Sequence, residues 1–152
     1  MGDAAQPDSD VIDDLATTLF ALETGTLPTD AVTALITREI VKWAVRRGWT
    51  ARTEARVMLP QGPAGAIRAG FVDVIVRRGD GTPDLAIEID SADKPWSVTK
   101  LRYAVAGGMH AVWIRWGDHE WAGIYDDVDV IQLPVARKPG SRRISDDQLA
   151  FW

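Results

Sequence analysis

The chain has 152 residues, of which 46% are hydrophobic and 26% are charged, as expected for a globular domain large enough to bury a core. It contains no cysteine, which excludes disulfides and thiolate metal sites, and no apolar run near the roughly 18 residues that a membrane span requires. Its first residues, MGDAAQPDSD, lack the basic and apolar regions of a signal peptide, so we expect a cytoplasmic protein without a membrane partner.

The net charge of −5 is unevenly distributed along the chain. Five aspartates and no Lys or Arg lie within the first fourteen residues. Subtracting these five from the 22 acidic residues leaves 17, which equals the 17 Lys and Arg residues. The acidic total therefore does not exclude a local basic surface for nucleic acid.

Hydrophobic spacing and turn residues divide the chain into three regions. We expect a flexible acidic tail over residues 1–8, a single domain over 9–134 and a mobile basic tail over 135–152. No internal repeat or domain boundary is evident within the central region. Within it, apolar residues three and four apart predict helices, and alternating apolar residues predict strands.

Capping residues predict where the helices begin: Ser9 or Asp10 for the first, Thr29 or Asp30 for the second, and Ser97 for the third. The order α-β-β-β-α-β, with further elements at both ends, predicts an α/β fold in which helices flank a mixed central sheet. The predicted helices cover residues 9–22, 29–48 and 97–106, and the predicted strands cover 50–59, 70–78, 84–90, 110–116, 121–125 and 128–133.

The strongest local signal is the segment RGDGTP, residues 78–83. An Asp-Gly pair between two β-rich runs favours a two-residue type I′ turn at Asp80 and Gly81. Residues that face each other across the hairpin then have numbers that sum to 161. One face of the hairpin becomes uniformly apolar in this register, pairing Val72 with Ile89, Val74 with Ile87 and Val76 with Leu85.

On the opposite face, the same register pairs Arg77 with Asp84 and places Asp73 directly across from Glu88, with Cβ atoms roughly 4.5–5.5 Å apart. Two carboxylates so placed repel each other unless a cation or a shared proton intervenes. Asp90 lies two residues beyond Glu88 on this face. Oxygen ligands of this kind suit Mg²⁺ or Mn²⁺ and predict a divalent-metal site. The alternative is a pair of acids at a solvated sheet edge, each neutralised by Arg or Lys.

The runs GFVDVIV and DLAIEID, a helix that opens with SVTKL, and the run HAVWIRW resemble the core of the PD-(D/E)xK nuclease superfamily, also called restriction-endonuclease-like. The resemblance covers roughly Val32 to Trp116. The resemblance implies an αβββαβ core, and it implies that Asp73 and Glu88 are the Mg²⁺ ligands.

The third signature position of the family, two residues after the acid, is usually Lys, whereas this chain has Asp90. Family members in which the lysine has moved to the following helix make Lys100 the candidate, with Lys94 as the second choice. If Ser97 is the N-cap, Lys100 is the third helical residue, where a capping box prefers Glu or Gln and the helix dipole disfavours a cation. Acids facing it could compensate for this, and Lys100 could then orient water or stabilise charge on the phosphate. The alternative is a solvent-exposed lysine.

Other charged residues are weaker candidates. The family often places a helical Glu near the metal, which makes Glu39 a candidate ligand, although an intrahelical pair with Lys42 is the favoured alternative. Glu54 is weaker still. Basic residues spaced four apart on the second helix, together with two on the first strand, could contact phosphates or form solvated surfaces. These candidate nucleic-acid contacts are Arg38, Lys42, Arg46, Arg52 and Arg56.

Together these features predict a metal-dependent nuclease that hydrolyses phosphodiesters in nucleic acid, with DNA as the favoured substrate and Mg²⁺ or Mn²⁺ as the cofactor. Asp73 and Glu88 would hold the metal, Asp90 would assist directly or through water, and Lys100 would position water or stabilise charge. The alternative is an inactive nuclease-fold module that binds nucleic acid or a protein partner, which Asp90 and the acidic net charge favour. A homodimer and a larger complex both remain open.

Overall fold

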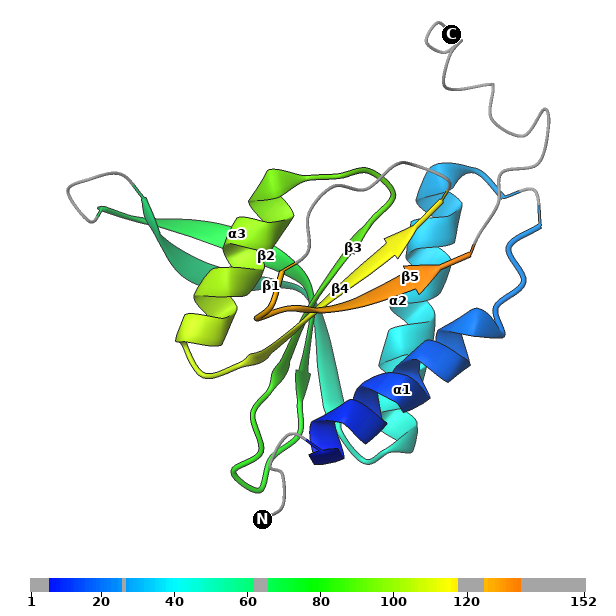
Figure 1. The fold of residues 1–152 in the computed structure, drawn as a ribbon, viewed down its shortest axis with the longest axis horizontal. Coiled ribbons are helices and arrows are strands. Elements are labelled where there is room, and N and C mark those ends of the chain that lie inside the picture. Colours follow the sequence, from blue (N-terminus) through cyan, green and yellow to red (C-terminus); the bar gives the residue numbers. More distant parts are fainter. Residues whose placement is uncertain (1–5, 26, 62–65, 118–124, 135–152) are drawn as a thin grey trace, which may run out of the picture.

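The computed structural model describes residues 6–25, 27–61, 66–117 and 125–134. Its elements in chain order are α1 (Gln6–Phe20), α2 (Thr29–Arg46), β1 (Thr50–Gln61), β2 (Ala66–Arg77), β3 (Leu85–Asp90), α3 (Pro95–Ala106), β4 (His110–Trp116) and β5 (Asp129–Leu133). The strands form one sheet in the order β1-β2-β3-β4-β5, antiparallel from β1 to β3 and parallel from β3 to β5 (Figure 1). The predicted α/β class with a mixed sheet is confirmed.

The helix starts differ from the predicted caps. α1 begins at Gln6, inside the predicted tail 1–8, and the N-cap of α2 is Pro28, which forms no side-chain cap. α3 begins at Pro95 with Lys94 as its N-cap, because proline presets φ and needs no hydrogen-bond partner at the first helical position. The predicted Ser97 cap is therefore wrong, and Lys100 is the sixth helical residue.

Part of the prediction falls on residues whose structure is not described. These are residues 1–5 of the acidic tail, all but Tyr125 of the predicted strand 121–125, and the whole of the basic tail 135–152. The predicted strand over 128–133 corresponds to β5.

Helices cover both faces of the sheet. Residues of α1 and α2 pack with Leu85, Ile87 and Ile89 in one hydrophobic layer, whereas α3 packs with Ala86 in the other. Adjacent residues of β3 enter opposite layers because side chains alternate along a strand. All six residues of β3 are buried, so its two acids, Glu88 and Asp90, lie inside the protein.

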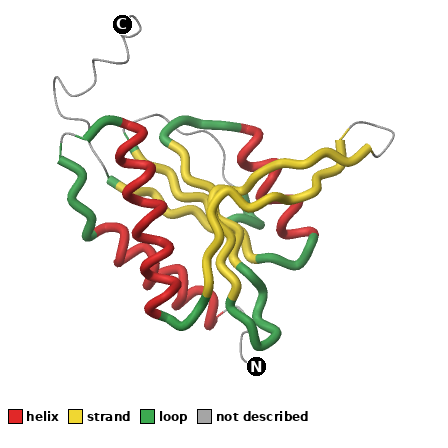
Figure 2. Tube along the Cα trace, turned by 180° about the vertical axis from the view of Figure 1, so that it is seen from behind, coloured by secondary structure: helices red, strands yellow, loops and turns green. Residues whose placement is uncertain are grey.

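The sheet divides at Asp73. Val72 and Val74 would face the same side of a straight strand, yet Val72 packs in the α3 layer and Val74 in the α1–α2 layer. Glu54, which the register places opposite Asp73, has a left-handed φ of 49°. The β2–β3 ladder stops at Val74–Ile87, whereas β1 and β2 stay paired to their ends and project beyond the sheet as a two-stranded arm (Figure 2).

The β2–β3 connection contains the predicted turn. Asp80 and Gly81 both have positive φ, 54° and 74°, and the Thr82 N–H donates to the Gly79 carbonyl at 2.9 Å, as in a type I′ turn. The strands end at Arg77 and begin again at Leu85, so the loop is longer than the predicted two residues. The three pairs of the ladder nevertheless sum to 161, so the predicted register is confirmed from Val74 to Val76. The predicted pair Val72–Ile89 lies beyond the ladder, and its side chains pack in different layers, so the expected uniform apolar face is wrong there.

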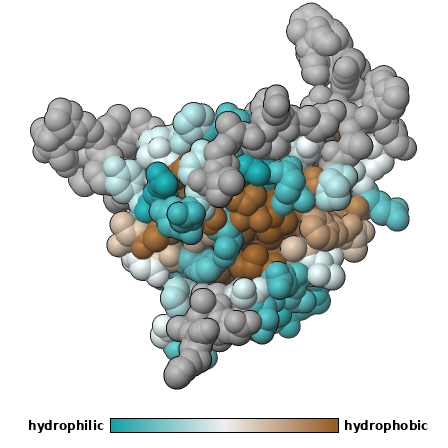
Figure 3. All heavy atoms as spheres, viewed as in Figure 1, coloured by the Kyte–Doolittle hydropathy of each residue, from teal (hydrophilic) through white to brown (hydrophobic). Residues whose placement is uncertain are grey.

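On the surface, apolar side chains gather over the middle of the face shown in Figure 3 and are bordered by polar residues. No described helix has the length and apolarity to cross a membrane. Large apolar side chains that are exposed among the described residues are Phe20, Leu27, Val45, Phe71, Trp96, Tyr103 and Val130.

We predict that Gly81→Ala destabilises the fold by about 1–2 kcal/mol, the cost of a left-handed residue with a Cβ atom. No atom lies within 4 Å of a Cβ added at Gly81, so the loss would come from backbone conformation alone. Urea unfolding would measure it. Gly107→Ala is the matched control, because Gly107 has a φ of −87° and its added Cβ makes ordinary contacts. Equal stability of the two variants would contradict the prediction.

Candidate functional site

Asp73 and Glu88 lie side by side where β2 and β3 separate. The Asp73 N–H donates to Glu88 Oε2 at 3.0 Å, and the Ile89 N–H donates to Asp73 Oδ2 at 2.8 Å. Each carboxylate thus accepts a hydrogen bond from the backbone of the other strand, at the level where the ladder has ended. The predicted adjacency of the two acids is confirmed, and these reciprocal bonds hold the strands together at the division.

The environment disfavours negative charge on both acids. Glu88 is 2% exposed, and burial, followed by the charge of Asp73, raises its pKa to about 7 against the opposing effect of Lys100. Burial also raises the pKa of Asp73, an effect that the Ile89 N–H partly offsets and the charge of Asp90 adds to. Near neutral pH, the pair therefore has a strong electrostatic need for a cation or a proton.

Lys100 supplies part of that positive charge. Its Nζ lies 3.2 Å from Glu88 Oε1 and donates to the Phe71 carbonyl oxygen at 2.6 Å. The side chain is 12% exposed, so the alternative of a solvent-exposed lysine is wrong. The capping argument for Lys100 also fails, because α3 begins earlier than predicted. Lys100 reaches the acids because α3 packs across β2 and β3.

Asp90 is next to the pair but is already engaged. It is 5% exposed, its Oδ2 accepts a hydrogen bond from Trp113 Nε1 at 2.8 Å, and its Oδ1 lies 3.6 Å from Lys94 Nζ. Its charge still raises the pKa of Asp73. Direct ligation of a metal through Oδ2 would compete with the buried Trp113 N–H, so Asp90 influences the pair mainly through its charge.

Glu39 does not join this group. It pairs with Lys42 and Arg46 on α2, each at 3.9 Å, and it is absent from the residues around the two pockets that Asp73 lines. The expectation that it reaches the metal site is corrected, and the intrahelical pair with Lys42 is confirmed. Over the described ranges, no three Asp, Glu, His or Cys side chains are grouped so that they could hold a metal ion.

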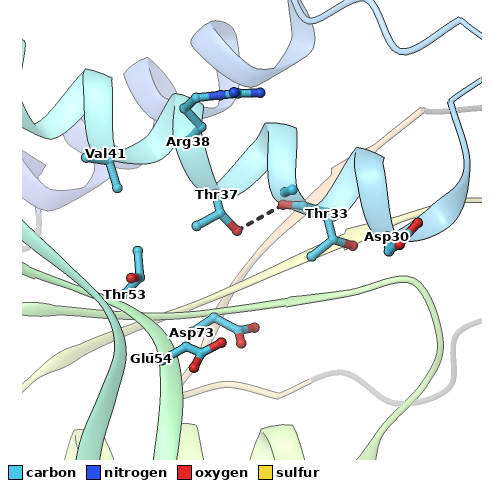
Figure 4. A pocket seen from close by; sticks show the side chains of 9 residues that line it. Asp30, Thr33, Thr37, Arg38, Val41, Thr53, Glu54 and Asp73 are labelled. Atoms are coloured by element: carbon cyan, nitrogen blue, oxygen red, sulfur yellow. Dashed lines mark hydrogen bonds between the residues drawn. The ribbon is translucent and has the colours of Figure 1, made fainter.

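Two pockets meet at Asp73. One, about 410 Å³ in volume, opens over both acids between the first turns of α2 and α3, with Thr33, Trp96 and Lys100 in its wall. The first turns of two helices therefore border this space, together with three carboxylates and two lysines, namely Asp73, Glu88, Asp90, Lys94 and Lys100. The other pocket lies between α2 and the β1–β2 hairpin, where the Asp73 and Glu54 carboxylates lie beside each other below Thr33 and Thr37 (Figure 4).

The predicted basic contacts fall on separate surfaces. Arg38 lines the α2 pocket, although its guanidinium extends along the helix and not toward the two carboxylates (Figure 4). Lys42 and Arg46 are exposed and paired with Glu39. Arg52 and Arg56 line a third pocket on the β1–β2 hairpin. The structure does not gather these five cations around the acids.

Sequence reasoning missed several groups that shape the site. The Ile89 N–H and the Phe71 carbonyl are backbone groups, which no residue pattern reveals. The Trp113–Asp90 hydrogen bond depends on the pairing of β3 with β4, where Glu88 lies opposite Trp113 and Asp90 opposite Arg115. The sequence does contain a signal for the position of Trp96. Pro95 is typical of a first helical residue, which places Trp96 in the first turn of α3.

Comparison with known proteins adds no assignment. No protein-family model matches this chain, and no curated protein is significantly similar to it.

We predict that the metal-free protein loses stability as the pH rises from about 5 to about 8. The folded state binds the Glu88 proton more tightly than the unfolded state, since its pKa is about 7 against the usual 4.5. This contribution is fully present below pH 4.5 and is lost as the pH passes through about 7. Urea unfolding in EDTA would measure it.

Glu88→Gln should flatten this pH dependence, because glutamine does not titrate. Glu23→Gln, at an exposed position after α1, is the matched control and should leave the dependence unchanged. A wild-type slope that survives Glu88→Gln would assign the effect to another group.

Proposed function

We propose that this protein is a metal-dependent phosphodiesterase that hydrolyses nucleic acid, with DNA as the favoured substrate, and that its fold is restriction-endonuclease-like. The observation that carries the proposal is the pairing of half-buried Asp73 with buried Glu88 at the division of the sheet, with the Lys100 ammonium 3.2 Å from Glu88 Oε1. Acids that line a pocket and whose pKa values are raised by burial are typical of functional sites.

The carboxylate pair fits Mg²⁺ or Mn²⁺. Mg²⁺ is commonly held by one or two carboxylates together with waters and substrate phosphates, so a third protein ligand is not required. Asp73 and Glu88 would hold the ion, and ion binding would favour the ionised form that burial disfavours. When bound, such an ion polarises a phosphate and makes a coordinated water more acidic.

The residues of the chain itself would perform the remaining tasks. Lys100 places a positive charge beside the pocket, where negative charge develops on a phosphate during hydrolysis. Its second bond, to the Phe71 carbonyl, orients the ammonium so that little reorganisation is needed during the reaction. The first turns of α2 and α3 would position the phosphate.

The order of elements supports the same proposal. The succession α2-β1-β2-β3-α3-β4 is the αβββαβ order that the resemblance implies, and Asp73 and Glu88 occupy its second and third strands. Lys100 lies on the helix that follows, where the resemblance allows the signature lysine to have moved.

A second candidate function is a module of the same fold that binds nucleic acid or a protein partner without cleavage. One observation favours it: Lys100 and the neighbouring backbone donors already satisfy most oxygens of the pair. Mn²⁺ titration separates the two candidates. A working metal site stabilises the fold by about 2.7 kcal/mol at a metal concentration 100 times the Kd, whereas a site that has lost metal binding shows no shift.

We predict that Asp73→Ala lowers Mg²⁺-dependent cleavage about 100-fold or more and abolishes the Mn²⁺-induced rise in Tm, because one of two metal ligands is lost. Cleavage of labelled DNA and thermal unfolding would measure the two effects. Glu39→Gln, which removes an acid outside the pocket, is the matched control and should retain both. Unchanged cleavage by the purified Asp73→Ala protein would refute the assignment.

We predict that Lys100→Met separates charge stabilisation from metal binding. Cleavage should fall about 100-fold or more, because the ammonium no longer stabilises the reacting phosphate. The Mn²⁺-induced rise in Tm should persist or increase, because Glu88 loses a competing cation. Lys42→Met on α2 should change neither. If Lys100→Met abolishes the Mn²⁺ effect, Lys100 serves to build the metal site instead.

A further inference from the structure

Two exposed aromatic residues lie close to the acid pair in the fold. Phe71 is 50% exposed and Trp96 is 39% exposed. Phe71 precedes Asp73 by two residues on β2, a separation of about 7 Å along the strand. Trp96 lies one helical turn before Lys100 on the same face of α3 and lines the pocket that opens over Asp73 and Glu88.

Contacts with Lys100 tie one of these aromatic residues to the acids. The Lys100 ammonium donates to the Phe71 carbonyl at 2.6 Å and contacts Glu88 at 3.2 Å. The backbone position of Phe71 is therefore coupled to the acid pair. Trp96 is held on the first turn of α3, the helix that carries Lys100. Of the two residues, Trp96 lines the pocket over the acids, whereas Phe71 contacts the site through its backbone carbonyl.

Cations accompany both rings. The Arg56 guanidinium carbon lies 5.9 Å from the Phe71 ring centroid, a cation–π contact across the β1–β2 pair. Lys94, whose side chain is 62% exposed, lies two residues before Trp96. Exposed aromatic rings beside cations have the chemistry that binds single strands, in which bases stack on the rings and phosphates contact the cations.

A duplex cannot use these rings in the same way. Its bases stack on one another, and a ring on the protein reaches a base face only if the nucleotide is flipped out at an energetic cost. An unpaired strand offers every base face without that cost.

We infer that the site selects an unpaired stretch of nucleic acid, whose bases stack on Phe71 and Trp96 while the phosphate between them lies over the Asp73–Glu88 pair. The inference rests on the proposed function for the role of the acid pair. It adds the class of substrate and two residues that determine it.

The test compares binding of a single-stranded oligonucleotide of about 12 nucleotides with its duplex, in DNA and in RNA, by fluorescence anisotropy. The buffer holds salt constant and contains Ca²⁺, which takes the same oxygen ligands as Mg²⁺, and the oligonucleotide is afterwards checked for cleavage. We expect the single strand to bind at least about tenfold more tightly than the duplex, with either sugar.

Trp96→Leu and Phe71→Leu should each weaken binding of the single strand about fivefold or more. This factor corresponds to roughly 1 kcal/mol, the lower end of what one stacked base contributes. Trp96→Phe keeps a ring and should retain most of the affinity. Phe20→Leu removes an exposed ring from the end of α1 and should have no effect. Equal affinity for both strand forms, or Leu variants that bind like wild type, would overturn the inference.

Photocross-linking of the wild-type protein to 5-iodouracil DNA keeps the test independent of variant folding. Cross-links in the peptides that contain Phe71 or Trp96 would support the inference, and cross-links confined to other peptides would overturn it. Failure of the two proposals is distinguishable. Mg²⁺-dependent cleavage of duplex without any aromatic effect leaves the proposed hydrolysis standing, whereas aromatic-dependent binding without cleavage leaves only the binding inference standing.

Discussion

The reciprocal hydrogen bonds between Asp73 and Glu88 are the interaction on which the rest of the structure depends. At their level the β2–β3 ladder has ended, and each carboxylate replaces a backbone acceptor by binding an N–H of the other strand. The strands can therefore separate without leaving these donors unsatisfied. The separation allows the β1–β2 hairpin to turn away as an arm, and it opens the pocket between α2 and α3.

This arrangement buries Glu88 and leaves Asp73 half-buried. Burial raises the pKa of both carboxylates, and Lys100 compensates for only part of the cost. Asp90 adds a second buried acid, which Trp113 holds through a hydrogen bond between strands. Such local costs typically persist where a site needs a defined electrostatic character. The fold tolerates the cost because β3 is otherwise apolar and packed on both faces.

Local sequence signals predicted the order of the elements and the adjacency of Asp73 and Glu88. The Asp-Gly turn set the hairpin register, and that register placed Asp73 beside Glu88, because side chains alternate and one face had to be apolar. Helix starts were predicted less well. Ser97 was predicted as the cap, but Pro95 begins α3, so the helix-position argument for Lys100 is wrong and only the family resemblance supports its choice. The prediction that Glu39 lies near the metal site is wrong. Helical periodicity gives the direction in which a residue points from the helix axis, but not which residues of other elements lie beside it.

The sequence by itself determined the order of the elements, the turn at Asp80–Gly81 and the pairing of the two acids, since each follows from residues close together in the chain. The tertiary structure alone decided what those acids contact. Lys100 reaches Glu88 because α3 crosses the sheet. Trp113 donates a hydrogen bond to Asp90 because β4 pairs with β3 in one particular register. Such contacts join segments that only packing brings together, and no local pattern encodes the distance between them. The sequence therefore predicted that Asp73 and Glu88 are adjacent, but it did not predict which groups neutralise their charge.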